Sequence, residues 1–468
     1  MPATSPTAAR LTLRPTTAPG NCPLPHALCA DVLVAGAGPA GAAAALGLAR
    51  MGYSVCVVGT ARPFEACEGI SRRVIEGLRH QGFRQALEMI PAPVMREVDW
   101  NGERRAQNTE HLLWRPGFDA ALRDDLKDAG VLFRSEQVAA VLPDHARPGL
   151  RLADGTVLHA RIIVEARGRA APQGRAAGLR GPATLAVLQR ARGPASDAGS
   201  AVFSFEEGWG WLARLPSGQR YVQICVDADT SGLPKRPGLA AWTRGRIAAL
   251  PQARAWLEGC EFDGAPVARA STAVLNARPW APGVLRVGDA AMAVDPLSGN
   301  GIFQSLSSAT AAPAVINTLL QNPDDSALAL GFHAARLRET FLRFARIGRD
   351  FHAAETRWPD APFWRSRMRW PDAVPAHVAV PHIEGLALRP VIEEGFIRER
   401  EVVLTNEQPL GVWRVEGAEI APLLRGLPEE TAARAAMLET RIAATALSPS
   451  QQGQLAAWFA RHGVGMAP

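Results

Sequence analysis

The segment DVLVA, residues 31–35, is apolar after its first residue and ends directly at a glycine. A run of this length bounded by glycine is typical of a strand that is buried on both faces in a parallel sheet. The small residues of 39–51 then predict a helix, and a second apolar run at 54–58 predicts the next strand. The pattern therefore predicts a strand–helix–strand unit with parallel strands.

Other patterns occur further along the chain. Hydrophobic and polar residues alternate in 201–216 and in 220–229, as expected for antiparallel strands. Over 327–356 the large apolar residues Leu337, Phe341 and Phe344 recur at helical spacing, which predicts an amphipathic helix.

Three glycines, Gly36, Gly38 and Gly41, join the first strand to the helix with the spacing G-x-G-x-x-G. The first permits a tight turn, the second lets the backbone approach a pyrophosphate, and the third lets the helix pack closely on the strand. Within a strand–helix–strand unit this motif predicts a dinucleotide site. The acid that usually holds the adenosine ribose is absent after the second strand, so we expect Thr60 or Arg62 to do so.

A second motif follows much later, in GVLRVGDAAMAVDPLSGNGIFQ, residues 283–304. It predicts a strand, then Gly288 and Asp289, then a loop that opens a helix near Asn300. A carboxylate after a strand can hydrogen-bond a polyol, and a helix N-terminus stabilises negative charge on a reduced ring. The second motif therefore suits a ligand with a polyol chain and a ring that can be reduced.

In these motifs the chain resembles the FAD-dependent monooxygenase superfamily, which includes the flavin-dependent tryptophan halogenases. The resemblance implies that Asp289 binds the ribityl chain, and that residues of the DPLSGNG loop line the isoalloxazine ring. A helix at 114–130, WRPGFDAALRDDLKDAG, is similar to the family's R-x-x-F-D-x-x-L helix. The cofactor-binding residues implied are Gly36, Gly38, Ala40, Gly41, Arg115, Val138, Gly288, Asp289, Pro296, Gly299, Asn300, Gly301 and Ile302.

The same resemblance implies an α/β fold: a Rossmann-like FAD-binding domain of the glutathione-reductase type over residues 31–385. A β-sheet substrate layer is expected to be inserted at about 85–110 and 175–280. Helical patterns in 386–468 predict a small C-terminal helical domain, and 1–30 read as a flexible N-terminal arm. The sequence contains no uncharged run of about 18 apolar residues, which is the length needed to cross a bilayer. The six cysteines are scattered without a C-x-x-C pair, so we expect no metal site and a cytoplasmic location.

The reaction implied is oxygenation of an electron-rich ring by reduced flavin and O2, for which no metal or Ser-His-Asp group is needed. Electrons would come transiently from NAD(P)H or a separate reductase, because no second dinucleotide motif follows a strand. Arg167 replaces the usual Asp or Thr in EARGR, which puts a standard nicotinamide-docking surface in doubt. Glu68, in the loop expected over the flavin, is the candidate catalytic base. The alternative is that Glu68 is a helix-start carboxylate near Ser71.

Halogenases of this superfamily carry a W-x-W-x-I-P motif and a lysine near the substrate. Here WGWLARLP has alanine and arginine in place of the isoleucine and proline. The two lysines of the chain, Lys127 and Lys235, lie in the 114–130 helix and in a loop. The sequence therefore disfavours halogenation.

Two segments, EGISRRVIEGLRHQGF and RWPDAPFWRSR, resemble a subgroup that oxygenates a tryptophan of a polypeptide during biogenesis of a tryptophan-derived quinone cofactor. The resemblance implies a polypeptide partner, the small subunit of an amine dehydrogenase. A small-molecule aromatic hydroxylase, a flavin-dependent halogenase and a non-catalytic FAD-binding assembly chaperone remain open alternatives.

Charge bears on the partner. The chain carries a net charge of +6, and residues 355–468 hold 12 arginines against 14 acids, so residues 1–354 carry +8. This surplus predicts attraction of an acidic partner. We expect neither a nucleic acid nor a membrane partner.

Overall fold

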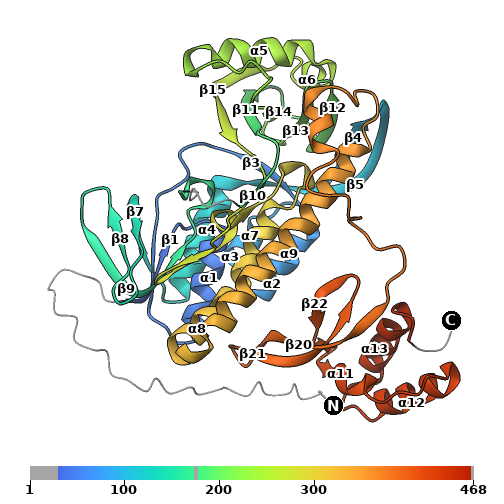
Figure 1. Ribbon diagram of the computed structural model, residues 1–468. Coiled ribbons are helices and arrows are strands. Elements are labelled where there is room, and N and C mark those ends of the chain that lie inside the picture. Colours follow the sequence, from blue (N-terminus) through green and yellow to red (C-terminus); the bar gives the residue numbers. More distant parts are fainter. Residues whose placement is uncertain (1–29, 173–177, 465–468) are drawn as a thin grey trace, which may run out of the picture.

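The computed structural model describes residues 30–172 and 178–464 (Figure 1). The arm predicted at 1–30 lies, apart from Ala30, outside the described residues. The predicted strand–helix–strand unit is present as β1 (Ala30–Ala35), α1 (Pro39–Arg50) and β2 (Val55–Val58). β1 and β2 pair in parallel, with Val32 opposite Val55, and all of β2 is buried. The apolar runs thus form central strands, as predicted.

The main sheet has the order β17-β18-β9-β1-β2-β6 and is parallel from β18 to β6; β17 pairs antiparallel with β18, and the β7–β8 hairpin is added antiparallel to β9. The further strands are β6 (Leu132–Arg134), β7 (Val138–Leu142), β8 (Gly149–Leu152), β9 (Val157–Glu165), β17 (Trp280–Ala281) and β18 (Val284–Arg286). β9, which lies far from β1 in sequence, pairs directly with it.

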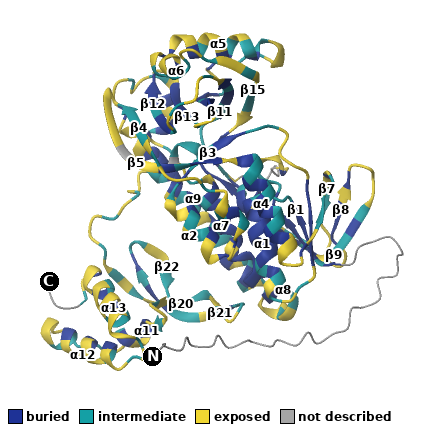
Figure 2. Cartoon of the chain, turned by 180° about the vertical axis from the view of Figure 1, so that it is seen from behind, coloured by how far each residue is buried: buried dark blue, intermediate teal, exposed yellow. Residues whose placement is uncertain are grey.

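Helices cover this sheet and form the largest hydrophobic core with it. They are α1, α2 (Arg72–His80), α3 (Gln85–Glu88), α4 (Arg115–Asp128), α7 (Gly301–Thr310) and α8 (Ala312–Gln321). Figure 2 shows that α1, α7 and β1 are largely buried. Small alanines along α1 allow the helix to lie close to the sheet and to α7.

The substrate layer is one sheet of the order β15-β11-β14-β13-β12-β4-β5-β3, antiparallel except for the parallel pair β12–β4. Its strands are β3 (Cys67–Ile70), β4 (Val94–Trp100), β5 (Glu103–Trp114), β11 (Thr184–Arg192), β12 (Gly199–Phe205), β13 (Gly208–Arg214), β14 (Gln219–Asp227) and β15 (Glu261–Ala270). Helices α5 (Leu239–Ala249) and α6 (Pro251–Trp256) cover its outer face (Figure 1). The α/β class with an added antiparallel sheet is confirmed.

A long helix, α9 (Ser326–Ala353), runs toward the substrate layer (Figure 1). Its predicted apolar face, Leu337, Phe341 and Phe344, is buried against the segment that follows β18. A small sheet lies there, made of β10 (Leu179–Arg180), β16 (Val274–Leu275) and β19 (Met292–Ala293), and α10 (Pro362–Arg367) follows α9.

The C-terminal part differs from the helical domain predicted for 386–468. Its helices are present as α11 (Ala421–Leu424), α12 (Thr431–Ala443) and α13 (Pro449–Arg461). They are preceded by an antiparallel sheet of β20 (Ile383–Glu393), β21 (Phe396–Thr405) and β22 (Gln408–Val412), and by the short pair β23 (Arg414–Val415) and β24 (Ala418–Glu419). Side chains along β20 alternate between half-buried and exposed, which is the period of a strand and not of a helix.

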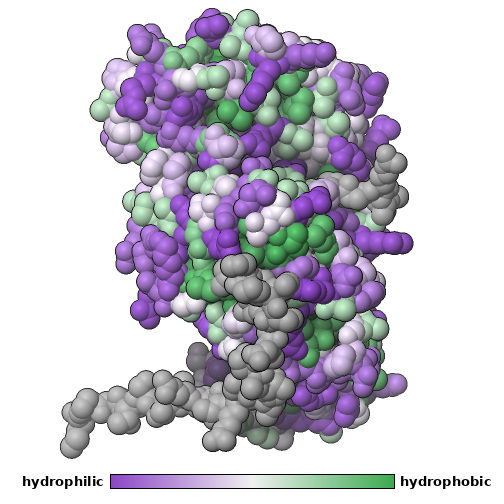
Figure 3. All heavy atoms as spheres, turned by 90° about the vertical axis from the view of Figure 1, so that its left-hand side faces the viewer, coloured by the Kyte–Doolittle hydropathy of each residue, from purple (hydrophilic) through white to green (hydrophobic). Residues whose placement is uncertain are grey.

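No described helix is long and apolar enough to cross a membrane. On the face seen in Figure 3, hydrophobic residues gather in the middle of the molecule, below the mostly hydrophilic part formed by the substrate layer.

Candidate functional site

The turn between β1 and α1 requires glycine at two of its three motif positions. Gly36 has φ +109°, and a Cβ there would lie 2.5 Å from the carbonyl oxygen of Ala166. A Cβ on Gly41 would lie 1.9 Å from the carbonyl oxygen of Gly36. By contrast, a Cβ on Gly38 would meet nothing within 4 Å. Two glycines therefore permit close packing, and the third borders open space at the start of α1.

That open space faces a helix N-terminus that no described side chain caps. Pro39 stands in the first turn, and the amide groups of the first turn carry the partial positive charge of the helix end. Uncapped amides beside an open space suit a phosphate group.

The two sequence motifs meet at Ala40. Gly288 has φ +58°, and a Cβ on it would lie 2.6 Å from the Cβ of Ala40. The Gly288 amide donates to the Ser308 hydroxyl at 2.8 Å, which fixes the turn after β18 to α7. The fold thus brings the glycine loop and the Gly288-Asp289 turn into contact.

Asp289 lies in the short 3-10 turn Gly288–Ala290, with 29% of its side chain exposed. Its carboxylate is 3.4 Å from the Arg169 guanidinium and accepts a 3.4 Å hydrogen bond from Ser305. Burial raises the pKa of Asp289 above its ordinary value, although Arg169 opposes the rise. Both contacts are long, so the carboxylate can also accept hydrogen bonds from a polyol.

The DPLSGNG loop ends at a second uncapped helix N-terminus. Its turn Pro296–Ser298 is followed by Gly299, which has φ +61°, and Asn300 precedes the first residue of α7. A Cβ on Gly299 or Gly301 would meet nothing within 4 Å. Ile302, in contrast, is 5% exposed and packs in the core, so only its backbone could face a ligand.

Arg115 and Glu68 form the centre of a chain of charges. Arg115, at the start of α4, is 4% exposed and donates to Glu68 at 2.5 Å and to Asp119 at 2.7 Å. Arg62 lies 3.5 Å from the other oxygen of Asp119. Burial by itself raises the pKa of Glu68, but Arg115 and Arg62 outweigh it, so its pKa lies below the ordinary value. Glu68 is therefore ionised near neutral pH.

The structure corrects the local setting of Glu68. It lies on strand β3, opposite Leu113 of β5, and not in a loop. The helix-start alternative is also not what is seen, because Glu68 pairs with Arg115, and α2 begins after Ser71 without a side-chain cap. The pairing of β3 with β5 was not predicted because only four residues form the strand.

At the same end of the parallel sheet as the glycine loop, Val138 begins β7 next to the EARGR motif, since β9 and β1 are parallel with Glu165 opposite Ala35. Arg167 donates to the Val138 carbonyl at 3.1 Å and to the Glu165 carboxylate at 2.6 Å. Glu165 is 2% exposed at the end of β9. The unusual Arg167 thus neutralises a buried acid.

Thr60 and Arg62, the residues expected to hold the adenosine ribose, are both exposed, and Arg62 lies in an ion pair with Asp119.

Above the loop, the inner face of the substrate layer is aromatic. Buried rings gather in one cluster, against which Leu297 of the loop packs: Trp209, Trp211, Tyr221, Phe363 and Trp364. The Trp211 indole donates to Glu110 at 3.1 Å, and the Trp209 indole nitrogen is buried without a partner among the described residues. These rings and Leu297 form one buried apolar cluster beside the loop.

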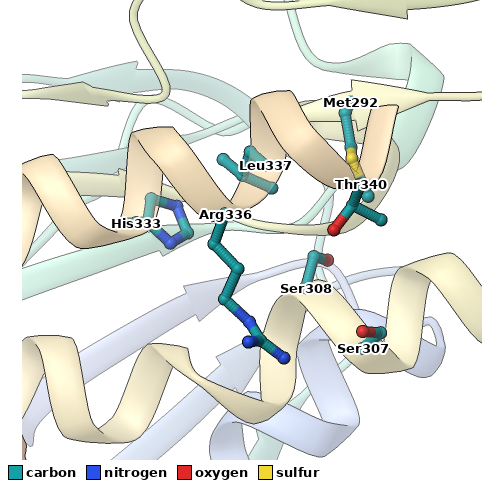
Figure 4. Close-up of a pocket in the computed structure, with 7 residues that line it drawn as sticks. All are labelled: Met292, Ser307, Ser308, His333, Arg336, Leu337 and Thr340. Carbon is teal, nitrogen blue, oxygen red and sulfur yellow. The ribbon is translucent and has the colours of Figure 1, made fainter. Parts of the chain in front are cut away.

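Two hollows lie away from this face. One, between α7 and α9, is lined by Ser307, Ser308, His333 and Arg336, with Arg336 reaching from α9 toward α7 (Figure 4). Its volume of about 10 Å³ suits roughly one water molecule, not a substrate. The other, about 270 Å³, lies between β12 and α6 on the outer side of the substrate layer. In residues 30–172 and 178–464, no group of three His, Cys, Asp or Glu side chains is arranged to hold a metal ion.

Comparisons with known proteins agree with this geometry. The family model described as lycopene cyclase protein matches residues 31–204. The menaquinone reductase of Mycobacterium tuberculosis is 31% identical over 356 residues, covering 68% of this chain and 85% of that protein. Digeranylgeranylglycerophospholipid reductase 2 of Methanopyrus kandleri is 28% identical, and the match covers 66% of this chain and 83% of that protein.

Among solved structures, the peptidyl tryptophan dihydroxylase QhpG, essential for tryptophylquinone cofactor biogenesis, is 45% identical. The match covers 93% of this chain and 100% of the QhpG chain, with a TM-score of 0.80. The chain belongs to the FAD-dependent oxidoreductase family that includes QhpG. The flavin-dependent halogenase CmlS is 18% identical with a TM-score of 0.72 over 94% of this chain, which shows a shared fold only.

This FAD-dependent oxidoreductase has residues that fit its cofactor. An open space at Gly38, two uncapped helix ends and a partly exposed Asp289 match the phosphates, the ring edge and the ribityl chain of a flavin nucleotide. The expectation of an enzyme is confirmed. The predicted positions at the two motifs come together, and Val138 is bonded to Arg167, whose Cα would lie 3.0 Å from a Cβ on Gly36.

Sequence reasoning missed several residues of this oxidoreductase. Arg169 and Ser305 hold Asp289, and Asp119 holds Arg115. Asp119 was visible in the R-x-x-F-D motif, where its position four residues after Arg115 places both on one face of α4. Arg169 carried no such signal, because its contact with Asp289 depends on how β9 and β18 pair.

Proposed function

We propose that this protein hydroxylates a tryptophan of a polypeptide during biogenesis of a tryptophan-derived quinone cofactor. The observation that carries the proposal is the 45% identity to QhpG over that chain's whole length. The polypeptide would be the small subunit of an amine dehydrogenase. Electrons would come from NAD(P)H or a separate reductase that binds transiently.

In this proposal the two helix ends and Asp289 hold FAD. The amides around Gly38, Ala40 and Gly41 would bind the pyrophosphate, and Asp289 would accept hydrogen bonds from the ribityl hydroxyls. The backbone of Gly299 and Gly301 would stabilise the negative charge that develops on the reduced ring. When bound and reduced, the flavin supplies the activation of O2.

The remaining work belongs to the side chains above the loop. The aromatic layer around Trp209 and Leu297 excludes water and holds the target indole flat. Glu68 is ionised and 36% exposed, so it is able to accept the proton that a hydroxylated ring loses. Arg115 orients that carboxylate.

The test is mass spectrometry of the precursor subunit incubated with the purified protein, a reductant and O2. We expect a gain of one or two oxygen atoms on a single tryptophan, and no product from free tryptophan. Efficient hydroxylation of free tryptophan would replace the proposal with a small-molecule aromatic hydroxylase. A gain of chlorine or bromine in the presence of halide would replace it with a halogenase.

A further inference from the structure

Two arginines share one aromatic ring at the border of the site. The guanidinium carbons of Arg269 and Arg62 lie 4.2 Å and 5.2 Å from the centre of the Phe64 ring. Arg62 and Phe64 follow β2, whereas Arg269 stands near the end of β15, the edge strand of the substrate layer. Cation–π attraction thus holds two distant segments together at the surface.

The charges at this point do not balance. Arg62 and Arg115 are matched by Asp119 and Glu68 in the chain of ion pairs, and Glu65, next to Phe64, is matched by Arg190. Arg269 forms no ion pair with any described carboxylate, and burial together with the charge of Arg62 lowers its pKa. One positive charge is therefore left uncompensated beside Phe64, where a second cation already lies.

Aromatic surface adjoins these cations. Trp114, 42% exposed, donates to Glu65 at 2.8 Å. Arg62, Phe64, Trp114 and Arg269 together form what we call the Arg–aromatic border. Tryptophan and arginine are the residue types that most often dominate binding energy in protein interfaces. The border continues into the site, because Glu68 follows on β3 and Trp114 pairs with Cys67.

We propose that the Arg–aromatic border is the docking surface for the polypeptide substrate, and that Arg269 with Arg62 binds an Asp or Glu carboxylate of that polypeptide near its target tryptophan. This inference rests on the proposed function. Charge complementarity selects the occupant: the uncompensated cation needs an anion, and residues 1–354 carry +8. Phe64 and Trp114 supply apolar contact beside the carboxylate.

The experiment compares Arg269→Glu, Arg269→Lys and a matched control, Arg244→Glu. Arg244 is exposed on α5, which covers the opposite face of the substrate layer, and forms no ion pair with a described residue. The precursor subunit is the probe. Its binding to each FAD-loaded variant and its hydroxylation are measured separately, at low and at high salt.

We expect Arg269→Glu to raise the Kd and the KM for the polypeptide about tenfold or more, with FAD content and kcat unchanged. Its binding should also depend less on salt, whereas Arg269→Lys keeps most of the affinity and Arg244→Glu keeps all of it. If Arg269→Glu binds and hydroxylates the polypeptide as well as the wild type does, this inference is overturned and the proposed function stands. A wild-type protein that neither binds nor modifies the polypeptide overturns the proposed function as well.

Discussion

Arg115 illustrates how much of the site depends on single side chains. It is almost fully buried, yet it is charged, and that is tolerated because Glu68 and Asp119 each accept hydrogen bonds from it. The same contacts keep Glu68 ionised. At this scale the chemistry of the site follows from which charges are adjacent.

At Asp289, replacement by alanine should lower FAD affinity tenfold or more. The lost hydrogen bonds to the ribityl hydroxyls involve a charged group and contribute about 1.5–3 kcal/mol. FAD content after purification and titration of the apoprotein would measure the change. Asp124→Ala, on the exposed side of α4, serves as the control. A fully yellow Asp289→Ala protein would contradict the assignment.

For Glu68, the glutamine variant should retain FAD but form product about 10²-fold more slowly, because an amide cannot accept the proton. Single-turnover product formation by the reduced enzyme measures this step directly. Since the pKa of Glu68 is lowered, the wild-type rate should fall only at acidic pH, and the variant should lack that fall. Turnover of Glu68→Gln at the wild-type rate would remove Glu68 from the mechanism.

The glycine loop offers a contrast between neighbouring positions. Gly41→Ala should fail to fold or lose stability strongly, because its methyl group would overlap the Gly36 carbonyl. Gly38→Ala should fold normally and bind FAD more weakly, because its methyl group would enter only the open space next to α1. Thermal unfolding of the two apoproteins and FAD titration separate the effects. Equal FAD affinity of Gly38→Ala and wild type would count against a phosphate there.

Whole elements are joined at a buried carboxylate where α9 meets the substrate layer. Glu355 is 0% exposed and accepts hydrogen bonds from the Asn101 amide at 2.8 Å, from Ser204 at 2.6 Å and from Arg357 at 2.8 Å. Asn101 lies in the turn between β4 and β5, and Ser204 lies on β12. One side chain after α9 therefore fixes two strands of the sheet above the loop.

This junction predicts a specific acid sensitivity. Burial would raise the pKa of Glu355, but its hydrogen bonds to Arg357 and Ser204 prevail and lower it to about 2. Because the folded pKa is depressed, the contribution is complete above the unfolded pKa near 4.5 and is lost as pH falls toward about 2. Glu355→Gln should lose about 3 kcal/mol of stability at pH 7 and show a flatter dependence between these values. Urea unfolding at several pH values would test it, and parallel curves would contradict it.

On the scale of the whole molecule, the C-terminal sheet is attached to the main core on the α8 side. Ile397 of β21 is 0% exposed within the core that surrounds α1, and its amide donates to Thr318 of α8 at 2.8 Å. Asn317 donates to the Gly395 carbonyl at 2.8 Å. Figure 1 shows this part well away from the substrate layer. The hairpin β20–β21 thus packs on the same hydrophobic core as the parallel sheet.

Ile397→Ala should therefore destabilise the whole protein by about 2–4 kcal/mol through a core cavity. Leu388→Ser is the matched control, since Leu388 on the neighbouring strand is 63% exposed and should change stability by less than about 0.5 kcal/mol. Thermal melts monitored by flavin release give both values. Equal melting temperatures would show that the C-terminal part unfolds independently.

The sequence by itself determined the features that are local. The turn glycines, the buried runs of β1 and β2 and the apolar face of α9 each arise from a few consecutive residues, whose spacing matches one backbone period, whereas the polar alternation predicted for β12–β14 is absent because both faces of these strands are buried. The cofactor could also be predicted, from family motifs. Such motifs are recognisable in a sequence because close backbone approach at Gly36 and Gly41 restricts those positions to glycine.

Only the tertiary structure decided which distant residues are partners. Glu68 pairs with Arg115 because β3 joins β5, and Asp289 meets Arg169 because β18 joins β9. Arg269 reaches Phe64 because β15 is the edge strand of the sheet. Each contact depends on strand order and register, which are set by the burial of the whole core and not by the residues near either partner.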